Sequence, residues 1–313
     1  MRLSTALLLS LVAALALAPA ASAKPKYRLG MGDQEASMFA DPNFQALNIK
    51  RVRYIVPWDV AEEPGQAAEV EGYMNMARFN GKEVLVAFSA RRGCFDGRYS
   101  RSRSCRAPSK KAFTSAFKAF REKYPYVKTY SAWNEANHVS QPTYRRPGLA
   151  VRYWDVLRRE CKRCKIVALD LLDSSNMGSY IRSFRRQAKG GPRVWGIHNY
   201  ADVNRRRSTK TREILRAVPG EVWMTETGGL VTFLPSFKYS PSRAAKRTRD
   251  MFKLADAYDT RRRGMRSRIT RVYPYQYTGV GRQERFDAGL VTESGETRPA
   301  YDVFKRFARN RLK

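Results

Sequence analysis

Two short segments of the sequence each carry a glutamate that could act as a catalytic carboxylate. Residues 130–138 read Tyr-Ser-Ala-Trp-Asn-Glu-Ala-Asn-His and contain Glu135, and residues 221–229 read Glu-Val-Trp-Met-Thr-Glu-Thr-Gly-Gly and contain Glu226. In both segments a β-prone apolar run precedes the carboxylate. Cleavage of a glycosidic bond needs two carboxylates on either side of the bond, one to protonate the leaving oxygen and one to stabilise or trap the oxocarbenium centre. The ends of two strands would be rigid enough to hold such a pair.

The elements that must hold these residues alternate regularly along the chain. Short β-branched or aromatic runs predict strands over residues 27–31, 51–57, 83–89, 127–133, 165–170, 194–198, 222–226 and 271–277. Amphipathic stretches predict helices over residues 110–123, 148–159, 179–187, 243–258 and 300–309. Eight strands separated by helices predict an α/β fold, a single (β/α)8 TIM barrel. The alternative, a doubly wound sheet, would rarely need eight regular units without a glycine-rich phosphate loop.

The loops that follow the strands of such a barrel form its catalytic face. Glu135 and Glu226 fall at the ends of the fourth and seventh predicted strands. Further candidate site residues lie at or near strand ends: Arg53, Trp58, Asn134, His198, Tyr200, Tyr275 and Tyr277. The aromatic residues among them are candidate platforms for the faces of pyranose rings, whereas Phe88 is interpreted as barrel core.

The chain has only two histidines, His138 and His198, and both fall on the predicted catalytic face. A lone histidine is more often a hydrogen-bonded structural group than a ligand or a base. His198 is favoured as a contact to substrate or to a catalytic carboxylate, while His138 is left open between a structural and a binding role. Neither histidine has a partner spacing that suggests a metal site, and no cofactor is expected.

Residues 1–23 have the order of a secretory signal peptide. Arg2 precedes an apolar run over residues 7–18, and Ala21-Ser22-Ala23 is a typical cleavage site. The apolar run is too short to span a bilayer, and no later segment is long and apolar enough. No linker or break in composition divides the remainder, so residues 24–313 are predicted to form one exported, extracellular catalytic domain.

Four cysteines remain after removal of the signal peptide: Cys94, Cys105, Cys161 and Cys164. An even number in an exported protein favours disulfides. A redox or zinc half-site is the alternative for Cys161 and Cys164, but zinc would need the other two cysteines in the same place. The predicted barrel puts the two pairs at opposite ends. We therefore predict the bonds Cys94–Cys105 and Cys161–Cys164.

The formal net charge of +32 is the most extreme property of the composition. Such a field attracts polyanions, and for an exported chain an anionic cell-wall polysaccharide is a better candidate than nucleic acid. The alternative is a general bias toward arginine in which the charges are merely solvated. No nucleic-acid-binding module is recognised, so nucleic acid is an unlikely partner.

Several motifs resemble those of clan A glycoside hydrolases, with cellulase-like family 5 and xylosidase-like family 39 as relatives. Trp-Asn-Glu-Ala-Asn at residues 133–137 is similar to their Trp-Asn-Glu-Pro-Asn signature, and Trp-Met-Thr-Glu-Thr-Gly at 223–228 is similar to their nucleophile strand. Residues 52–58 resemble the second-strand segment whose arginine lies under the nucleophile, and residues 196–200 resemble the sixth-strand His-x-Tyr motif. The resemblance covers nearly all of residues 24–313.

The resemblance implies a retaining O-glycosyl hydrolase that acts on a β-linked polysaccharide or oligosaccharide, with Glu135 as acid/base and Glu226 as nucleophile. Asn134 would bond the 2-hydroxyl of the sugar. Arg53 would keep Glu226 ionised, and apolar neighbours such as Trp133 would raise the pKa of Glu135.

Two departures from the family pattern favour a different reading. Ala136 replaces the usual proline, and residues 271–277 lack the tryptophan that usually ends the eighth strand. Tyr275 or Tyr277 would have to replace that ring. The alternative is therefore a catalytically weak or inactive TIM-barrel protein that binds anionic cell-wall polysaccharide.

Overall fold

The computed structural model describes residues 27–309 and 311, and its strands form two five-stranded parallel sheets. The inner strands are β1 (Arg28–Leu29), β2 (Met31–Gly32), β3 (Arg51–Pro57), β4 (Glu83–Ser89), β7 (Thr129–Ser131), β8 (Lys165–Val167), β9 (Asp170–Leu172), β10 (Val194–His198), β11 (Gly220–Thr227) and β13 (Ser267–Pro274). One sheet has the order β1-β13-β11-β10-β9, and the other has the order β2-β3-β4-β7-β8.

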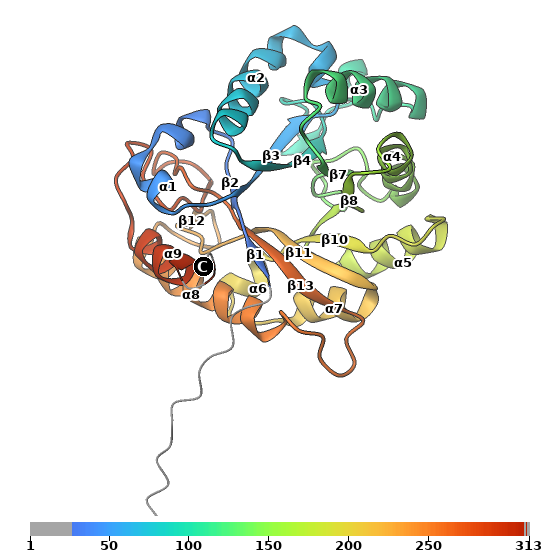
Figure 1. The fold of residues 1–313 in the computed structure, drawn as a ribbon. Coiled ribbons are helices and arrows are strands. Elements are labelled where there is room, and N and C mark those ends of the chain that lie inside the picture. The colour runs from blue at the N-terminus through green and yellow to red at the C-terminus, as the bar shows by residue number, and fades with distance from the viewer. Residues whose placement is uncertain (1–26, 310, 312–313) are drawn as a thin grey trace, which may run out of the picture.

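The two sheets join into one ring because the first and fifth barrel strands are each divided between them. β1 pairs with β13 while β2 pairs with β3, and β8 pairs with β7 while β9 pairs with β10. At the first break, Gly30 donates its N–H to the oxygen of Val272 at 2.8 Å, and a Cβ there would lie 2.4 Å from the Tyr273 ring. The predicted (β/α)8 TIM-barrel fold is confirmed, with the strands at the centre and the helices around them (Figure 1).

The helices pack their apolar faces against the strands. Their bounds are α1 (Pro42–Ala46), α2 (Pro64–Phe79), α3 (Lys110–Lys123), α4 (Pro147–Glu160), α5 (Met177–Gln187), α6 (Tyr200–Asn204), α7 (Thr209–Ala217), α8 (Pro241–Ala257) and α9 (Pro299–Arg309), with short 3-10 helices over Ala36–Ala40, Val60–Glu62 and Arg103–Cys105. Phe88 of β4 packs edge-on against Phe113, Phe117 and Phe120 of α3, so it belongs to the core as predicted. The helices α2 and α7 were not predicted from the sequence, because α2 contains two glycines and α7 is short and strongly polar.

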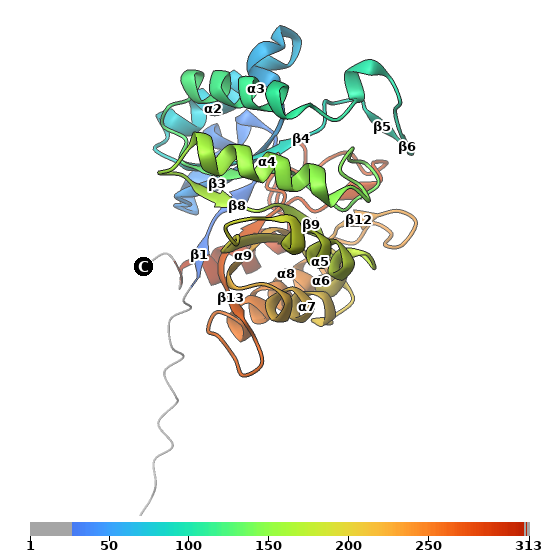
Figure 2. The same cartoon turned by 90° about the vertical axis from the view of Figure 1, so that its right-hand side faces the viewer.

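The loops that follow the strands gather at one end of the barrel. Two small antiparallel pairs stand there, β5 (Phe95–Asp96) with β6 (Arg98–Tyr99) and β12 (Thr232–Phe233) with β14 (Phe286–Asp287). Both lie toward the right in Figure 2, opposite β1. The Cys94–Cys105 disulfide holds the first of these loops, and the Cys161–Cys164 disulfide lies in the turn between α4 and β8. Both predicted pairings are confirmed.

The predicted signal peptide, residues 1–23, lies outside the described residues. Within residues 27–309 and 311, every helix is too short or too polar to cross a bilayer.

Candidate active site

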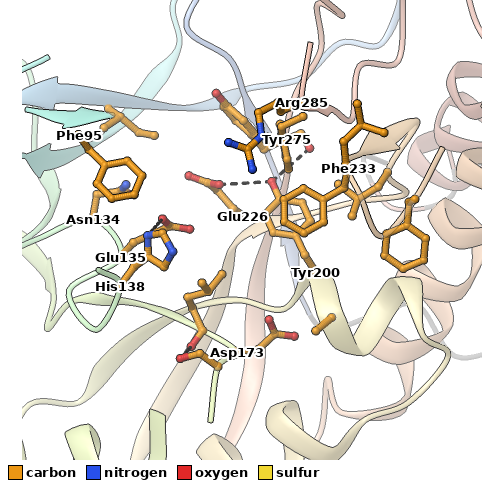
Figure 3. Close-up of a pocket in the computed structure, with 18 of the residues that line it drawn as sticks. Phe95, Asn134, Glu135, His138, Asp173, Tyr200, Glu226, Phe233, Tyr275 and Arg285 are labelled. Atoms are coloured by element: carbon orange, nitrogen blue, oxygen red, sulfur yellow. Dashed lines mark hydrogen bonds and ion pairs between the residues drawn. The ribbon is translucent and has the colours of Figure 1, made fainter. Parts of the chain in front are cut away.

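A cavity of about 750 Å³ opens at the end of the barrel where the strand-following loops gather. Figure 3 shows Glu135 and Glu226 facing it. Its lining residues are Ile55, Phe95, Gly97, Asn134, Glu135, His138, Leu172, Asp173, Ser174, Tyr200, Ala201, Arg205, Glu226, Leu230, Phe233, Leu234, Phe237, Tyr275, Arg285 and Phe286. Apolar rings therefore surround a small set of convergent polar groups, as in a ligand site.

The backbone around Glu135 is held in an uncommon conformation. Glu135 lies four residues beyond the end of β7 and has a φ of 44°, in the left-handed region that non-glycine residues seldom adopt. The amides on either side are fixed, because Asn134 donates to the oxygen of Phe88 at 2.7 Å and Ala136 donates to the oxygen of Asp170 at 3.0 Å. The surrounding strands thus impose a strained turn that directs the Glu135 carboxylate into the cavity.

Glu226 lies inside β11 and is held by a buried arginine. Arg53 Nη1 is 2.7 Å from Glu226 Oε1, and the Tyr200 hydroxyl donates to Glu226 Oε2 at 3.3 Å. The Arg53 side chain is fully buried, and its Nη2 also donates to Asp170 Oδ2 and to Asn134 Oδ1, each at 2.7 Å. Buried charges are stable only when paired in this way, so the Arg53 guanidinium holds the carboxylates of Glu226 and Asp170 in fixed positions.

His198 lies between the two glutamates. Its Nδ1 is 3.2 Å from Glu135 Oε1 and 3.5 Å from Glu226 Oε2. One oxygen of each glutamate and one nitrogen of His198 all lie within 4.8 Å of one another. Burial lowers the pKa of His198, but the charge of Glu226 and the hydrogen bonds of Asp170 and Glu135 raise it more, to about 9. The imidazolium therefore links the two carboxylates.

The prediction that apolar neighbours such as Trp133 raise the pKa of Glu135 is wrong. Trp133 faces away from the cavity, where its Nε1 donates to Gln141 Oε1 at 2.9 Å and its ring stacks on Tyr153. Burial raises the pKa of Glu135, but the hydrogen bond and charge of His198, with smaller contributions from His138 and Arg53, outweigh it. The pKa of Glu135 is therefore held below its usual range rather than raised.

Glu135, His198 and Glu226 also present donor atoms that could hold a metal ion. Zinc and similar ions do bind such carboxylate and imidazole sets. The Arg53 guanidinium 2.7 Å from Glu226 already supplies a positive charge to this group. This arrangement supports the expectation of a site that works without a metal, which the chelator experiment below tests.

We expect His198 to stabilise the folded protein most at neutral and acidic pH. Because its pKa is raised to about 9, the stabilisation is fully present below the unfolded value of about 6.5 and is lost as the pH rises to about 9. The free energy of unfolding of wild type relative to His198→Gln should fall by on the order of 3 kcal/mol across this window. Urea unfolding between about pH 6 and 10 measures it. A difference that does not change with pH would mean that His198 contributes by packing alone.

His138→Gln is the matched control for this experiment. The His138 ring is only partly buried, and its Nδ1 contacts Glu135 Oε2 at 3.7 Å. The free energy of unfolding of the His138→Gln variant should change with pH in the same way as that of wild type.

The structure brings most of the sequence-predicted site residues together. Asn134, Glu135, His138, Tyr200, Glu226 and Tyr275 line the cavity, and Arg53 and His198 lie buried against the two glutamates. Two of the predicted aromatic platforms do not line this cavity. Tyr277 is buried, donates its hydroxyl to Asp41 Oδ2 at 2.7 Å and packs against Phe44, while Trp58 packs against the core outside the lining.

Other residues of the site were missed from the sequence. Asp170 ends the predicted strand 165–170, and its position as a carboxylate at a strand end was a usable signal. Asp173 follows soon after it. The remaining missed residues lie in loops without a motif: Phe95, Arg205, Phe233, Phe237, Arg285 and Phe286.

No family model and no curated protein sequence matches the chain. Solved structures of similar fold do exist. A family 39 glycoside hydrolase from Bacteroides cellulosilyticus WH2 aligns with a TM-score of 0.56 at 14% identity, over 91% of this chain and 64% of that one. The chain therefore spans somewhat less than two thirds of that structure.

Two further structures align over more of their own length. An endo-1,4-beta-xylanase from Caldicellulosiruptor owensensis gives a TM-score of 0.61 at 11% identity, over 90% of this chain and 96% of that one. A GH30 endoxylanase from Clostridium papyrosolvens C71 gives a TM-score of 0.56 at 16% identity, over 92% of this chain and 73% of that one. The resemblance to clan A glycoside hydrolases is thus confirmed at the level of the fold.

Proposed function

We propose that this protein is a secreted, retaining O-glycosyl hydrolase that cleaves β-linked glycosides by double displacement. The observation that carries the proposal is the approach of one Glu135 oxygen to one Glu226 oxygen within 4.8 Å. Retaining enzymes hold their carboxyl groups about 5–5.5 Å apart, whereas inverting enzymes leave about 6.5–9.5 Å for a water molecule. The separation supports the retaining reaction.

In the first step, a Glu226 oxygen attacks the anomeric carbon, and the bond from that carbon to the leaving oxygen breaks. Glu135 donates a proton to the leaving oxygen. In the second step, Glu135 takes a proton from water, which attacks the same carbon and releases Glu226. Arg53 positions the Glu226 carboxylate for the attack through their ion pair, and Asn134, which lines the cavity, is placed to bond a sugar hydroxyl.

The low pKa of Glu135 means that its acid proton must come from a neighbour. His198 holds a proton at neutral pH and contacts Glu135 Oε1 at 3.2 Å. A bound sugar that excludes water makes separated charges less favourable, so the proton passes from His198 Nδ1 to Glu135. Once Glu226 is esterified and neutral, the charge that raised the pKa of His198 most is gone, which eases proton movement through the pair.

A polysaccharide or oligosaccharide substrate is supported by the neighbours. Two xylanase structures of the same fold contain xylohexaose and xylotetraose. Export is supported by the sequence of residues 1–23 and by the two disulfides. We also propose that residues 24–313 form one catalytic domain, and that its +32 charge attracts an anionic cell wall.

The missing strand-eight tryptophan favoured an inactive binding protein as the alternative. Tyr275 and Tyr200 line the cavity together with Glu226, so aromatic rings are available there to stack on a sugar. This favours the enzyme.

A panel of aryl β-glycosides and β-linked polysaccharides, assayed with and without EDTA, tests the proposal. We expect turnover that EDTA leaves unchanged, and proton NMR should show the β-anomer as the first product. An initial α-anomer would mean an inverting enzyme, loss of activity with EDTA would mean a metal site, and no turnover at all would favour the binding protein.

A further inference from the structure

Two arginines without carboxylate partners line one side of the cavity. Arg205 follows α6, and Arg285 lies in the loop between β13 and β14. Both side chains are exposed, and neither is within 4.0 Å of a carboxylate among residues 27–309 and 311. Figure 3 shows the Arg285 side chain pointing into the cavity near Tyr275. A guanidinium left unpaired inside a cavity is available to an anionic ligand.

Aromatic rings surround these two cations. Phe237 lies under Arg205, with 5.6 Å between the guanidinium carbon and the ring centroid. Phe233 remains 44% exposed and packs edge-on against Phe286 at 6.1 Å. Large exposed apolar rings at a cavity mark a binding surface. Rings beside a guanidinium suit a ligand that has both an apolar face and a negative charge.

The carboxylates of the cavity do not neutralise the two arginines. Glu226 is paired with Arg53, and Glu135 with His198. Asp173, the third acid in the lining, is almost fully buried and accepts the N–H of Asp202 at 2.8 Å. Burial raises the pKa of Asp173 to about 7, so it carries less than a full charge at neutral pH. The side of the cavity formed by the loops after β10, β11 and β13 is therefore net positive.

We propose that this side of the cavity binds a uronic acid residue of the substrate, with Arg285 as the main contact to its carboxylate and Arg205 as a second. The pyranose face would lie against the phenylalanine rings. This inference rests on the proposed function, because it takes the cavity to be a carbohydrate site. It names the substrate class as a β-linked polysaccharide that contains uronic acid.

The test is a comparison of short acidic oligosaccharides with their neutral counterparts. The probes are β-1,4-linked tetramannuronate against mannotetraose, and glucuronosyl-substituted xylotetraose against xylotetraose. Calorimetric titration of the full chain carrying Glu226→Gln, which prevents turnover, gives the affinities. We expect at least one acidic probe to bind about 10-fold or more tightly than its neutral partner, because a hydrogen bond to a charged group contributes that much.

Arg285→Gln should remove that advantage and leave the affinity for the neutral probe within about 2-fold. Arg282→Gln is the matched control, since Arg282 lies on the same loop, is exposed and stacks on Tyr239 outside this cavity. It should keep the advantage. Equal binding of acidic and neutral probes, or equal losses in both arginine variants, would overturn the inference.

Turnover, measured separately on the wild-type chain, distinguishes this inference from the proposed function. Selective binding of acidic probes without cleavage would support the uronic acid site and contradict the proposed hydrolase activity. Cleavage of neutral glycosides without selective binding of acidic probes would support the hydrolase activity and contradict the uronic acid site.

Discussion

Glu226→Ala should abolish turnover of every β-glycoside, whereas Glu135→Ala should spare substrates with good leaving groups. Without the Glu226 carboxylate no glycosyl ester forms, so the quality of the leaving group does not matter. Without Glu135 the leaving oxygen receives no proton, which should slow poor leaving groups by ~10²–10⁴-fold and activated aryl groups much less in the first step. Steady-state kinetics on a series of aryl β-glycosides with different leaving-group pKa values measures the contrast.

External azide separates the two roles further. In Glu135→Ala, azide should accelerate the second step and give a β-glycosyl azide, because it attacks the ester formed by Glu226. In Glu226→Ala, any azide product should be the α-anomer. Glu221→Gln is the matched control, since Glu221 lies at the other end of β11 and binds Lys165 there. Equal loss of turnover in Glu135→Ala and Glu226→Ala, with no effect of azide on either, would contradict the assignment of Glu135 as acid/base and Glu226 as nucleophile.

The strands and the carboxylate pair could be predicted because their signals are local. The strands 51–57, 83–89 and 194–198 were predicted with the bounds that the structure has. Each consists mainly of apolar, β-branched or aromatic residues, as is typical of buried parallel strands. Glu135 and Glu226 follow from the same logic, since residues at the carboxyl ends of barrel strands must meet at one face.

The failures came from side-chain direction and from loops. Residues 271–277 were predicted as one strand, which would place Tyr275 and Tyr277 on the same side. The strand ends at Pro274, however, and the chain then turns, so that Tyr277 packs in the core. Trp133 likewise packs against Tyr153 and points away from Glu135, although it is only two residues from it in the sequence.

The contacts of His198 and Arg285 depend on tertiary structure. His198 meets Glu135 across 63 positions of sequence, and Arg285 reaches the cavity only because β14 pairs with β12. The motif at residues 196–200 indicated a site role for His198, but nothing in the sequence indicated one for Arg285. Arg53, His198 and Glu226 lie on strands, whereas the cavity residues that the sequence did not predict, such as Arg285, lie in the loops between strands, where the sequence signal is weakest.

Arg53→Met should destabilise the fold and remove activity together. The change leaves Asp170 and Glu226 buried without their shared cation, and breaking a buried ion pair in this way costs about 3–5 kcal/mol. Although burial raises the pKa of Asp170, the charge of Arg53 holds it well below its usual range. The stability that this shift provides is present above the unfolded pKa of about 3.9 and is lost as the pH falls below it. The cost of Arg53→Met should therefore be large at neutral pH and should shrink toward about pH 4, where the unpaired Asp170 carboxylate takes up a proton. Urea unfolding at the two pH values measures this change.

A second variant separates stability from catalysis at this position. Arg53→Met combined with Asp170→Asn removes one of the two stranded charges, so it should regain much of the free energy of unfolding. It should not regain turnover, because Glu226 still lacks the guanidinium 2.7 Å from its Oε1 that holds the carboxylate in position. If the double variant recovers wild-type kcat together with its stability, Arg53 serves only to compensate the charge of Asp170.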